Sequence, residues 1–186
     1  MNSATHSPVH TTTYDRSACS VGILHLGFGA FHRAHQAVYI DDYMQVSGDL
    51  RWGIAAVNLR GSETAHFDIA DADITRNDGY YLKSYSADGD VALRLVRSHI
   101  HFADWSADKA KTEALLSEPS VHLVTITVTE SGYYTDPNGN LNAADPTMKA
   151  EIAGGTPQSV YGYLRAGLSQ RVAATGAPLT IACCDN

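Results

Sequence analysis

The fold of this chain is decided by residues 21–42, VGILHLGFGAFHRAHQAVYIDD. The apolar run from Val21 to Leu26 predicts a buried strand. Gly27 and Gly29 permit a tight turn after it, and they let a ligand approach the backbone because neither carries a side chain. Residues 30–45 then predict one helix. The side chains expected on its apolar face are Phe31, Ala34, Val38 and Tyr39.

A strand, a glycine turn and a helix form the setting in which a dinucleotide pyrophosphate binds. The general fingerprint of that turn, G-x-G-x-x-G/A, requires Gly or Ala three residues after the second glycine. This chain has His32 at that position. Taken alone, the turn leaves two interpretations open, a dinucleotide site and an ordinary strand-to-helix turn.

The longer run GFGAFHRAHQA, residues 27–37, resembles the G-x-G-x-F-H-R-A-H-Q motif of the polyol-specific long-chain dehydrogenases. That family includes mannitol 2-dehydrogenase and fructuronate (mannonate) reductase, and its own motif carries His at the position of His32. Tyr14–Ser17 also resembles the segment that precedes the motif in the family. The resemblance implies an α/β, Rossmann-like fold and an oxidoreductase that uses NAD or NADP on a polyol or a sugar acid. It implies that the turn holds the cofactor through Gly27, Phe28, Gly29, Ala30, Phe31 and His32.

Composition narrows the class of protein. The chain has 186 residues, of which 44% are hydrophobic, so it is long enough for one domain with a core. A net charge of −7 argues against nucleic acid or an anionic membrane as the main partner. No window is long enough for a membrane helix and no signal peptide precedes the motif, so we expect a cytoplasmic location. The three cysteines, an odd number with one vicinal pair, predict no disulfide framework.

A second apolar run, residues 52–59, predicts the next parallel strand. In dinucleotide-binding folds an acidic residue at the end of this strand holds the adenosine ribose, but this chain has Asn58, Leu59 and Arg60 there. Arg60 could pair with a 2′-phosphate, stack on adenine or be solvated, and Glu63 could still reach the ribose. We count Asn58 and Arg60 as cofactor-binding candidates, and the choice between NAD and NADP stays open.

A third strand is predicted over residues 121–128, and its end carries further candidates. Residues just beyond the carboxyl end of a central parallel strand lie where ligands bind. The segment also resembles the family motif that lines the cofactor cleft. The candidates there are Val128, Thr129 and Glu130. Glu130 could bind ribose or lie near a proton path, and the alternative is an ordinary loop carboxylate.

The middle of the chain has a different pattern. Residues 64–75 predict a helix, and residues 80–86 and 91–96 predict strands joined by an Asp-Gly turn. With a possible third strand over residues 98–102, they predict an antiparallel insertion inside a mostly parallel sheet. His99 and His101 would share one face of that third strand; we favour surface histidines over a metal pair and predict no metal site.

The C-terminal part predicts a helix and a last strand. Thr156 and Pro157 form a helix-start signal for residues 159–174, and residues 179–184 predict the strand. The expected apolar face of the helix is Tyr161, Leu164, Leu168 and Val172. The end of the chain resembles the family's S-C-D-N motif, which implies that Asn186 helps bind the substrate oxygen that is oxidised or reduced.

One part of the family's chemistry is missing from the sequence. The family's general base is a lysine in a K-x-x-x-x-N-x-x-H motif, and none of Lys83, Lys109, Lys111 and Lys149 has that spacing. We therefore expect a tail over residues 1–20, a dinucleotide-binding domain over residues 21–186, and no substrate domain. The chain would be a cofactor-binding fragment with little activity alone, and its uncovered apolar face would favour self-association. The alternatives are a non-catalytic nucleotide-binding or interaction module and, less favoured, a reductase of another small carbonyl.

Overall fold

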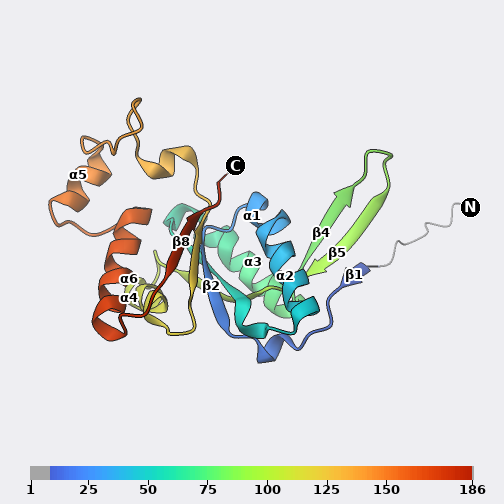
Figure 1. Ribbon diagram of the computed structural model, residues 1–186. Helices are drawn as coiled ribbons and strands as arrows, with labels where there is room; N and C mark the ends of the chain where they lie inside the picture. Colours follow the sequence, from blue (N-terminus) through green and yellow to red (C-terminus); the bar gives the residue numbers. More distant parts are fainter. Residues whose placement is uncertain (1–8, 186) are drawn as a thin grey trace, which may run out of the picture.

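The computed structural model describes residues 9–185 and contains two sheets (Figure 1). The main sheet has five parallel strands in the order β6-β3-β2-β7-β8. Their bounds are His99–Asp104, Gly53–Asn58, Val21–Leu26, Leu123–Ile126 and Thr180–Cys183. The smaller sheet has the order β1-β5-β4, with bounds Val9–Thr11, Val91–Val96 and Tyr80–Tyr85.

Six α-helices connect the strands of the described part of the chain. They are α1 Ala30–Ala34, α2 Gln36–Ser47, α3 Thr64–Asn77, α4 Lys109–Ala114, α5 Pro146–Ile152 and α6 Val160–Ala174. Short 3₁₀ turns cover Arg16–Ala18, Leu50–Trp52, Gly61–Glu63, Leu115–Ser117 and Glu130–Tyr133. No helix among residues 9–185 has the length and apolar character that a membrane crossing requires.

The chain enters the main sheet at its centre. It starts with β2, moves outward through β3 to β6, and then returns to the other side of β2 to add β7 and β8. The strand order therefore reverses between β2 and β7, which creates a crevice at the carboxyl ends of these two strands. The prediction of an α/β, mostly parallel, Rossmann-like sheet is confirmed.

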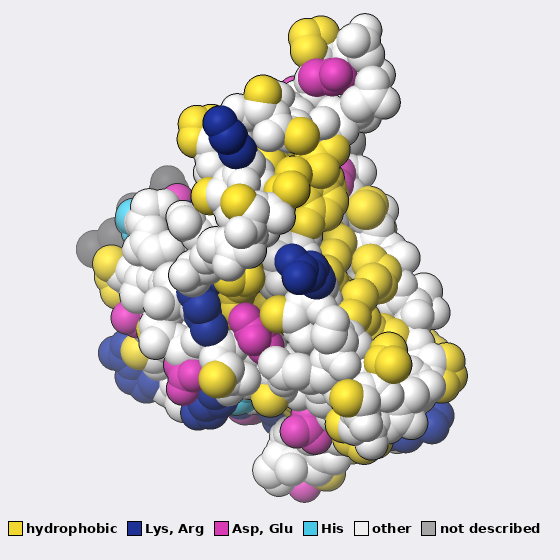
Figure 2. Space-filling view, turned by 90° about the vertical axis from the view of Figure 1, so that its left-hand side faces the viewer, with side chains coloured by type: hydrophobic (Ala, Val, Ile, Leu, Met, Phe, Trp, Pro, Cys, Tyr) yellow, Lys and Arg dark blue, Asp and Glu magenta, His cyan; other side chains and the backbone are white. Residues whose placement is uncertain are grey.

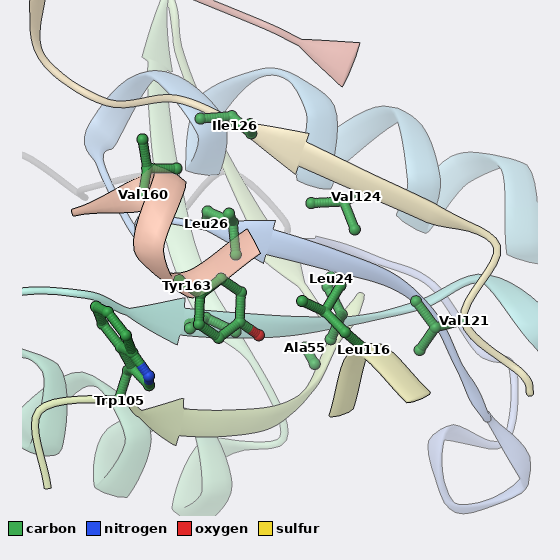
Figure 3. Close-up of a cluster of buried hydrophobic side chains, with 11 residues drawn as sticks. Leu24, Leu26, Ala55, Trp105, Leu116, Val121, Val124, Ile126, Val160 and Tyr163 are labelled. Atoms are coloured by element: carbon green, nitrogen blue, oxygen red, sulfur yellow. The ribbon is translucent and has the colours of Figure 1, made fainter. Parts of the chain in front are cut away.

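The core lies against the two central strands. Figure 3 shows Leu24 and Leu26 of β2 beside Val124 and Ile126 of β7, with Tyr163 of α6 packed over them. Leu24 and Leu26, like Val124 and Ile126, alternate with the pleat and so share this face, while the residues between them are buried on the opposite face of the sheet. The other buried members of this cluster are Ala55, Val57, Trp105, Leu116, Val121 and Val160.

The hairpin lies outside the main sheet. Strands β4 and β5 pair antiparallel, as predicted, but they form a separate sheet with β1 instead of an insertion in the parallel sheet. The predicted third strand of the insertion is β6, which pairs in parallel with β3 at the edge of the main sheet. Figure 1 shows the hairpin projecting away from the main sheet, next to the N-terminal strand.

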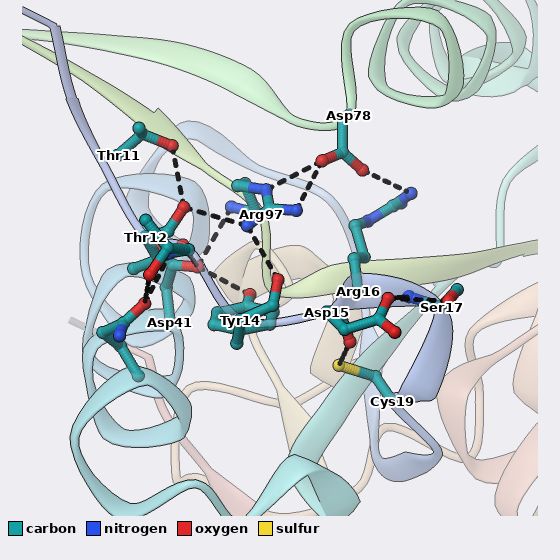
Figure 4. Close-up of polar contacts among 12 residues, drawn as sticks. Thr11, Thr12, Tyr14, Asp15, Arg16, Ser17, Cys19, Asp41, Asp78 and Arg97 are labelled. Atoms are coloured by element: carbon teal, nitrogen blue, oxygen red, sulfur yellow. Dashed lines mark hydrogen bonds and ion pairs between the residues drawn. The ribbon is translucent and has the colours of Figure 1, made fainter.

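The segment before β2 is held by a buried carboxylate. Asp41 of α2 is fully buried and accepts hydrogen bonds from Thr12 Oγ1 (3.1 Å) and Tyr14 Oη (2.7 Å). Arg94 of β5 pairs with the same carboxylate at 2.8 Å. Arg97 donates to the carbonyl oxygens of Thr12 and Tyr14, as Figure 4 shows. Residues 9–20, which belong to the tail predicted over residues 1–20, therefore include a strand and are tied to both α2 and β5. Residues 1–8 of that predicted tail lie outside the described residues.

The helix predicted over residues 30–45 is divided at His35, so the prediction of one helix was wrong. His35 has φ −120° and ψ −89°, outside the helical region. The buried residues of the two helices are His32, Ala37, Asp41 and Met44. Their last three members have helical spacing, but His32 lies five residues before Ala37, and the break absorbs the extra residue. Phe31 and Tyr39, predicted on the apolar face, are exposed.

The start and the face of α6 also differ from the prediction. Ser159, not Thr156, is the N-cap, and its side chain accepts from the backbone N–H of Gly162. Tyr161 and Val172 of the predicted apolar face are exposed. The buried residues are instead Val160, Gly162, Tyr163, Gly167 and Arg171.

Arg171 explains part of this difference. Its side chain is 2% exposed and all five of its N–H groups donate to backbone carbonyl oxygens. The distances lie between 2.7 and 3.2 Å. The acceptors are Leu116, Glu118, Val121, Ala177 and Pro178. One buried guanidinium therefore joins the loop before β7 to the loop before β8.

We expect Arg171→Met to lower the free energy of unfolding by about 3–4 kcal/mol, because it leaves several buried carbonyl oxygens without a donor. Urea unfolding followed by circular dichroism measures the change. Arg165→Met is the matched control, since Arg165 is exposed on the same helix, and it should change the free energy by less than about 0.5 kcal/mol. Equal losses in the two variants would contradict the role given to Arg171.

Candidate functional site

A cavity of about 660 Å³ lies at the carboxyl ends of β2, β3 and β7. This is the crevice where the strand order reverses and where open α/β sheets bind ligands. The residues that line it come from the strand ends and the loops after them. They are Gly27, Phe28, Gly29, Arg33, Asn58, Leu59, Arg60, Glu63, His66, Phe67, Ala70, Thr127, Val128, Thr129, Gly132, Tyr134, Gln158, Ser159 and Val160.

Gly27 shapes the floor of this cavity. Its φ of +113° lies in the region that side chains rarely adopt. A Cβ atom at Gly27 would lie 2.8 Å from the carbonyl oxygen of Thr127, because the ends of β2 and β7 come together here. The position therefore requires glycine for both its conformation and its close contact.

Gly29 has a different role. Its φ of −71° suits any residue, and an added Cβ would meet no atom within 4 Å. The space beside it belongs to the cavity, so a side chain here would occupy ligand volume without straining the fold. The helix that follows, α1, has only five residues, so its dipole gives an anion little help. Arg33 places a cation in the lining of this cavity, and its guanidinium lies 5.2 Å from the centre of the Phe28 ring.

The end of β3 is organised by hydrogen bonds to Asn58. Its side-chain amide donates to Asp104 Oδ2 and to the carbonyl oxygen of Arg60, both at 3.0 Å, and its oxygen accepts from the Arg60 N–H at 3.1 Å. Asn58 lines the cavity, but these bonds engage its polar atoms with the protein. The Arg60 guanidinium donates to Thr129 Oγ1 at 3.1 Å, and so it links the loop after β3 to the loop after β7.

The loop after β7 is held by the end of the chain. The backbone N–H of Val128 donates to Asp185 Oδ1 at 3.0 Å, and the Tyr133 hydroxyl donates to the other oxygen of the same carboxylate. Val128 and Thr129 line the cavity, whereas Glu130 is exposed and does not. Asn186, the predicted substrate-binding residue, lies outside the described residues.

A smaller cavity of about 280 Å³ lies on the other side of Thr127. Thr127 is the one residue that lines both cavities. The lining of the smaller one is Phe31, His32, His35, Gln36, Tyr39, Ile40, Thr127 and Cys184. The predicted site residues are thus divided between two spaces, with Phe31 and His32 in the smaller one and Ala30 in neither.

Three histidines form a buried cluster beneath the glycine turn. The rings of His25 and His32 stack with their centres 3.3 Å apart, and His32 Nε2 lies 2.9 Å from His99 Nε2. The register of β6 against β3 shifts between His99 and His101. His99 is buried and His101 is half-buried, so the prediction of surface histidines was wrong for His99.

Burial keeps these histidines neutral. It lowers the pKa of His32 to about 4, and it also lowers the pKa values of His25 and His99, to which a neighbouring histidine adds a smaller effect in the same direction. Among residues 9–185, no group of three or more His, Cys, Asp or Glu side chains is arranged to hold a metal ion. The cluster is therefore a hydrogen-bonded network of uncharged rings.

Sequence reasoning missed several residues of the site. Arg33, Thr127, Gln158 and Ser159 line the larger cavity, and His25 lies under its floor. A signal existed for Arg33, which is a cation just after the glycine turn. A signal also existed for Thr127, which directly follows β7. Gln158 and Ser159 reach the cavity only through the packing of α6, for which the sequence offers no local signal.

The strand order and the cleft define the Rossmann class of α/β domains. A sequence model described as "Mannitol dehydrogenase Rossmann domain" matches residues 21–186. The chain belongs to this mannitol dehydrogenase family.

Relatives of known name agree with this assignment. The chain is 35% identical over 181 residues to mannitol 2-dehydrogenase of Pyrenophora tritici-repentis, covering 96% of this chain and 31% of that protein. It is 34% identical over 165 residues to D-arabinitol 4-dehydrogenase of Ralstonia nicotianae, covering 88% and 35%. A solved ternary complex of Pseudomonas fluorescens mannitol 2-dehydrogenase with NAD and D-mannitol matches with a TM-score of 0.86 and 31% identity, covering 96% and 36%. The chain thus spans about a third of the length of these relatives.

We expect Gly27→Ala to lower the free energy of unfolding by about 2–3 kcal/mol, because it adds both strain at a positive φ and a contact with Thr127. Gly29→Ala is the control and should change it by less than about 1 kcal/mol, since its φ is negative and the space is open. Thermal unfolding of both variants checks the pair. An unchanged melting temperature for Gly27→Ala would contradict the close contact described here.

The neutral histidines predict a loss of stability in weak acid. Their pKa values are lowered in the folded chain, so below about pH 6.5 the unfolded chain binds protons that the folded chain does not. Stability is therefore full above that pH and falls as the pH drops towards 4. Each buried histidine contributes up to about 1.4 kcal/mol per pH unit.

Urea unfolding at pH 7.5, 6.0 and 5.0 measures this dependence. Stability that stays constant between pH 6.5 and 5 would show that the three buried rings gain protons without unfolding.

Proposed function

We propose that this chain binds NAD or NADP in the larger cavity, as the cofactor-binding part of an oxidoreductase that acts on a polyol or a sugar acid. The observation that carries the proposal is the cavity at the β2–β7 crossover, whose floor requires Gly27 and whose wall is left open at Gly29. The relatives named mannitol 2-dehydrogenase and D-arabinitol 4-dehydrogenase support the substrate class. Mannitol with fructose and mannonate with fructuronate are the substrate pairs that fit the resemblance.

The residues around the cavity suit a dinucleotide. Phe28 and Gly29, which follow the turn formed by Gly27, offer backbone against which phosphates can pack, and Arg33 supplies a positive charge beside them. Arg60 and Glu63 lie on the wall formed after β3, where the adenosine ribose would be expected. A bound nicotinamide would supply the hydride transfer, while the protein orients it. We propose Val128 and Thr129 as further contacts on the β7 side, with Ala30, Phe31, His32 and Glu130 in supporting positions.

We propose that Asn186 binds the reacting substrate oxygen, on the strength of its motif. Its neighbour Asp185 accepts from the N–H of Val128, a residue of the larger cavity. Four lysines are present, and none of them lines either cavity of the described chain. This supports a chain with little dehydrogenase activity by itself, and it equally favours the second candidate, a non-catalytic nucleotide-binding module.

Titration of the purified chain with NADH and NADPH, followed by nicotinamide fluorescence, tests the proposal. We expect saturable binding of NADH, and Gly29→Val should weaken it at least about tenfold, because the isopropyl group would occupy the cavity. Arg60→Met should weaken NADPH more than NADH if Arg60 pairs with the 2′-phosphate. A folded chain that binds neither nucleotide would contradict the proposal, and turnover of mannitol or fructuronate by the chain alone would contradict the predicted inactivity.

We also propose that the chain associates with itself through an apolar face. Exposed hydrophobic residues of α5, α6, β8 and the loop before α5 are Leu141, Ile152, Tyr161, Val172 and Ile181. Figure 2 views the molecule from the side on which α5 and α6 lie and shows hydrophobic side chains gathered in a band. Strand β8 pairs only with β7 among the described strands, so its outer edge offers unpaired backbone groups.

Light scattering after size exclusion, at several protein concentrations, tests self-association. We expect a mass that rises above 20.0 kDa with concentration, and Ile181→Lys should reduce it, because a charge on an edge strand opposes pairing. Val46→Lys is the control, since Val46 is exposed on α2. A chain that stays monomeric at all concentrations would contradict the proposal.

A further inference from the structure

A continuous chain of hydrogen bonds runs under the glycine turn from β6 to the cavity floor. His99 Nε2 lies 2.9 Å from His32 Nε2, and His32 Nδ1 lies 3.0 Å from Gln36 Oε1. The Thr125 hydroxyl donates to the same Gln36 oxygen at 3.0 Å. This first half of the series of hydrogen bonds ends at Thr125, a buried residue of β7.

The second half leads from Thr125 to the cavities. His25 Nδ1 lies 2.8 Å from Thr125 Oγ1, and His25 Nε2 lies 2.9 Å from Thr127 Oγ1. Both ring nitrogens of His25 are thus engaged, each with a threonine. Since Thr127 lines both cavities, these hydrogen bonds connect the buried side chain of His99 to the two cavities.

Because the three histidines are neutral, the donor and the acceptor of each hydrogen bond in the series are determined by those of its neighbour. A neutral imidazole has one N–H donor and one acceptor nitrogen, so the bond on one side of a ring fixes the bond on the other side. Because Thr125 donates to Gln36 Oε1, His25 must donate to Thr125 through Nδ1. His25 Nε2 is then an acceptor, and Thr127 must donate its hydroxyl proton to it.

The other half follows in the same way. Gln36 Oε1 can only accept, so His32 donates to it through Nδ1 and accepts through Nε2. His99 then donates through Nε2, and its Nδ1 carries a lone pair. Within the described chain, His99 Nδ1 is buried without a hydrogen-bond partner.

The orphaned nitrogen decides between this direction and its reverse. With the Gln36 amide turned over, its NH₂ would donate both ways, every bond would reverse, and His99 Nδ1 would carry a buried N–H without an acceptor. A buried N–H without a partner is rarer and more costly than a buried acceptor without one. The unpaired nitrogen therefore favours the direction that ends with Thr127 as donor to His25.

We call this directed series of hydrogen bonds from His99 to Thr127 the relay. We propose that the relay fixes Thr127 Oγ1 as a hydrogen-bond acceptor towards the cavities. Thr127 would then recognise an uncharged donor, a hydroxyl or amide group, on the nicotinamide half of the dinucleotide. None of His25, His32, Gln36 and His99 lines the larger cavity, so they act on a ligand there through Thr127 and are positioning residues. A phosphate, which only accepts, is disfavoured beside Thr127, because the hydroxyl proton is already committed to His25. The inference rests on the proposed function for the identity of the ligand but not for the direction of the relay.

Long-range ¹H–¹⁵N correlation spectra of the ¹⁵N-labelled chain at pH 7.5 test the direction without any ligand. The expected result is a proton on Nδ1 of His25 and His32 and on Nε2 of His99. One or two reversed rings would break the continuity of the hydrogen bonds, and three reversed rings would give them the opposite direction; either result overturns the relay. In Gln36→Glu the carboxylate can only accept hydrogen bonds, so the three histidines should keep the same tautomers. In Gln36→Leu no acceptor remains at this position, so this set of tautomers should be lost although circular dichroism shows the protein to be folded.

Titrations of the Thr127 variants test the ligand. Thr127→Val should weaken NADH binding about two- to tenfold, the value of one neutral hydrogen bond, and Thr127→Ser should restore it. A parallel loss with ADP-ribose identifies a ribose hydroxyl as the donor, and a loss confined to NADH identifies the carboxamide. A loss that also appears with ADP, or no loss with any of the three, overturns the recognition role.

The two hypotheses fail in different ways. If the folded wild-type chain binds none of NADH, ADP-ribose and ADP, the proposed function fails and the recognition role fails with it, while the tautomers still report on the relay. If the chain binds NADH but the tautomers are reversed, the proposed function stands and the relay is overturned.

Discussion

The close approach of β2 and β7 at Gly27 is the constraint on which the site depends. The Gly27 N–H donates to Val57 of β3, and the Thr127 N–H donates to Leu26 of β2, so the ladder continues to the last residue before the turn. A side chain at Gly27 would collide with the Thr127 carbonyl. If Gly27 and Thr127 did not approach so closely, the ends of β2 and β7 would separate. The larger cavity, the smaller cavity and the histidine cluster would then lose their common boundary.

Buried polar residues, together with the apolar core, set the positions of the helices around this point. His32 fixes α1 against β2 and β6, Asp41 fixes α2 against the N-terminal segment, and Arg171 fixes α6 against two loops. Each of them satisfies its polar atoms through several partners, which is the condition for burying such groups without a large penalty. The cost of removing one partner is correspondingly high, because the others would be left unpaired.

This explains which parts of the fold could be predicted from the sequence. The strands of the main sheet and of the β4–β5 hairpin were found because apolar or alternating runs bounded by turn residues have few other interpretations. Strand β1 at Val9–Thr11 was missed, because the polar sequence around it shows no such pattern. The buried faces of α2 and α6 were mispredicted because an apolar-face rule selects Tyr39 and Val172, which are exposed, and ignores Asp41 and Arg171, which are buried. A helix face is decided by what it meets, and for both helices the partner is a set of backbone or hydroxyl groups from distant segments.

In the candidate site, too, local sequence patterns predicted some residues and distant contacts decided the others. Residues directly after the strands were predictable, because the carboxyl ends of parallel strands share one edge. The roles of His25 and His99 were not, because a histidine inside a strand shows neither its burial nor its partner in the sequence. The separation of Phe31 and His32 from the larger cavity depends on the break at His35, which no glycine or proline marks.

The protein has a net negative charge, whereas the larger cavity has an excess of positive charge. The distance between most of the acidic residues and the cavity makes the two compatible. The chain carries a net charge of −7, yet the walls of the larger cavity include two arginines, Arg33 and Arg60, against one carboxylate, Glu63. Salt screens exposed charges over about 8–10 Å, so the remote acidic residues contribute little inside the cleft. A negatively charged ligand would therefore be held by the local excess of positive charge, and the five-residue α1 need not supply it. The overall acidity keeps other polyanions off the surface while the cleft remains favourable to one that fits it.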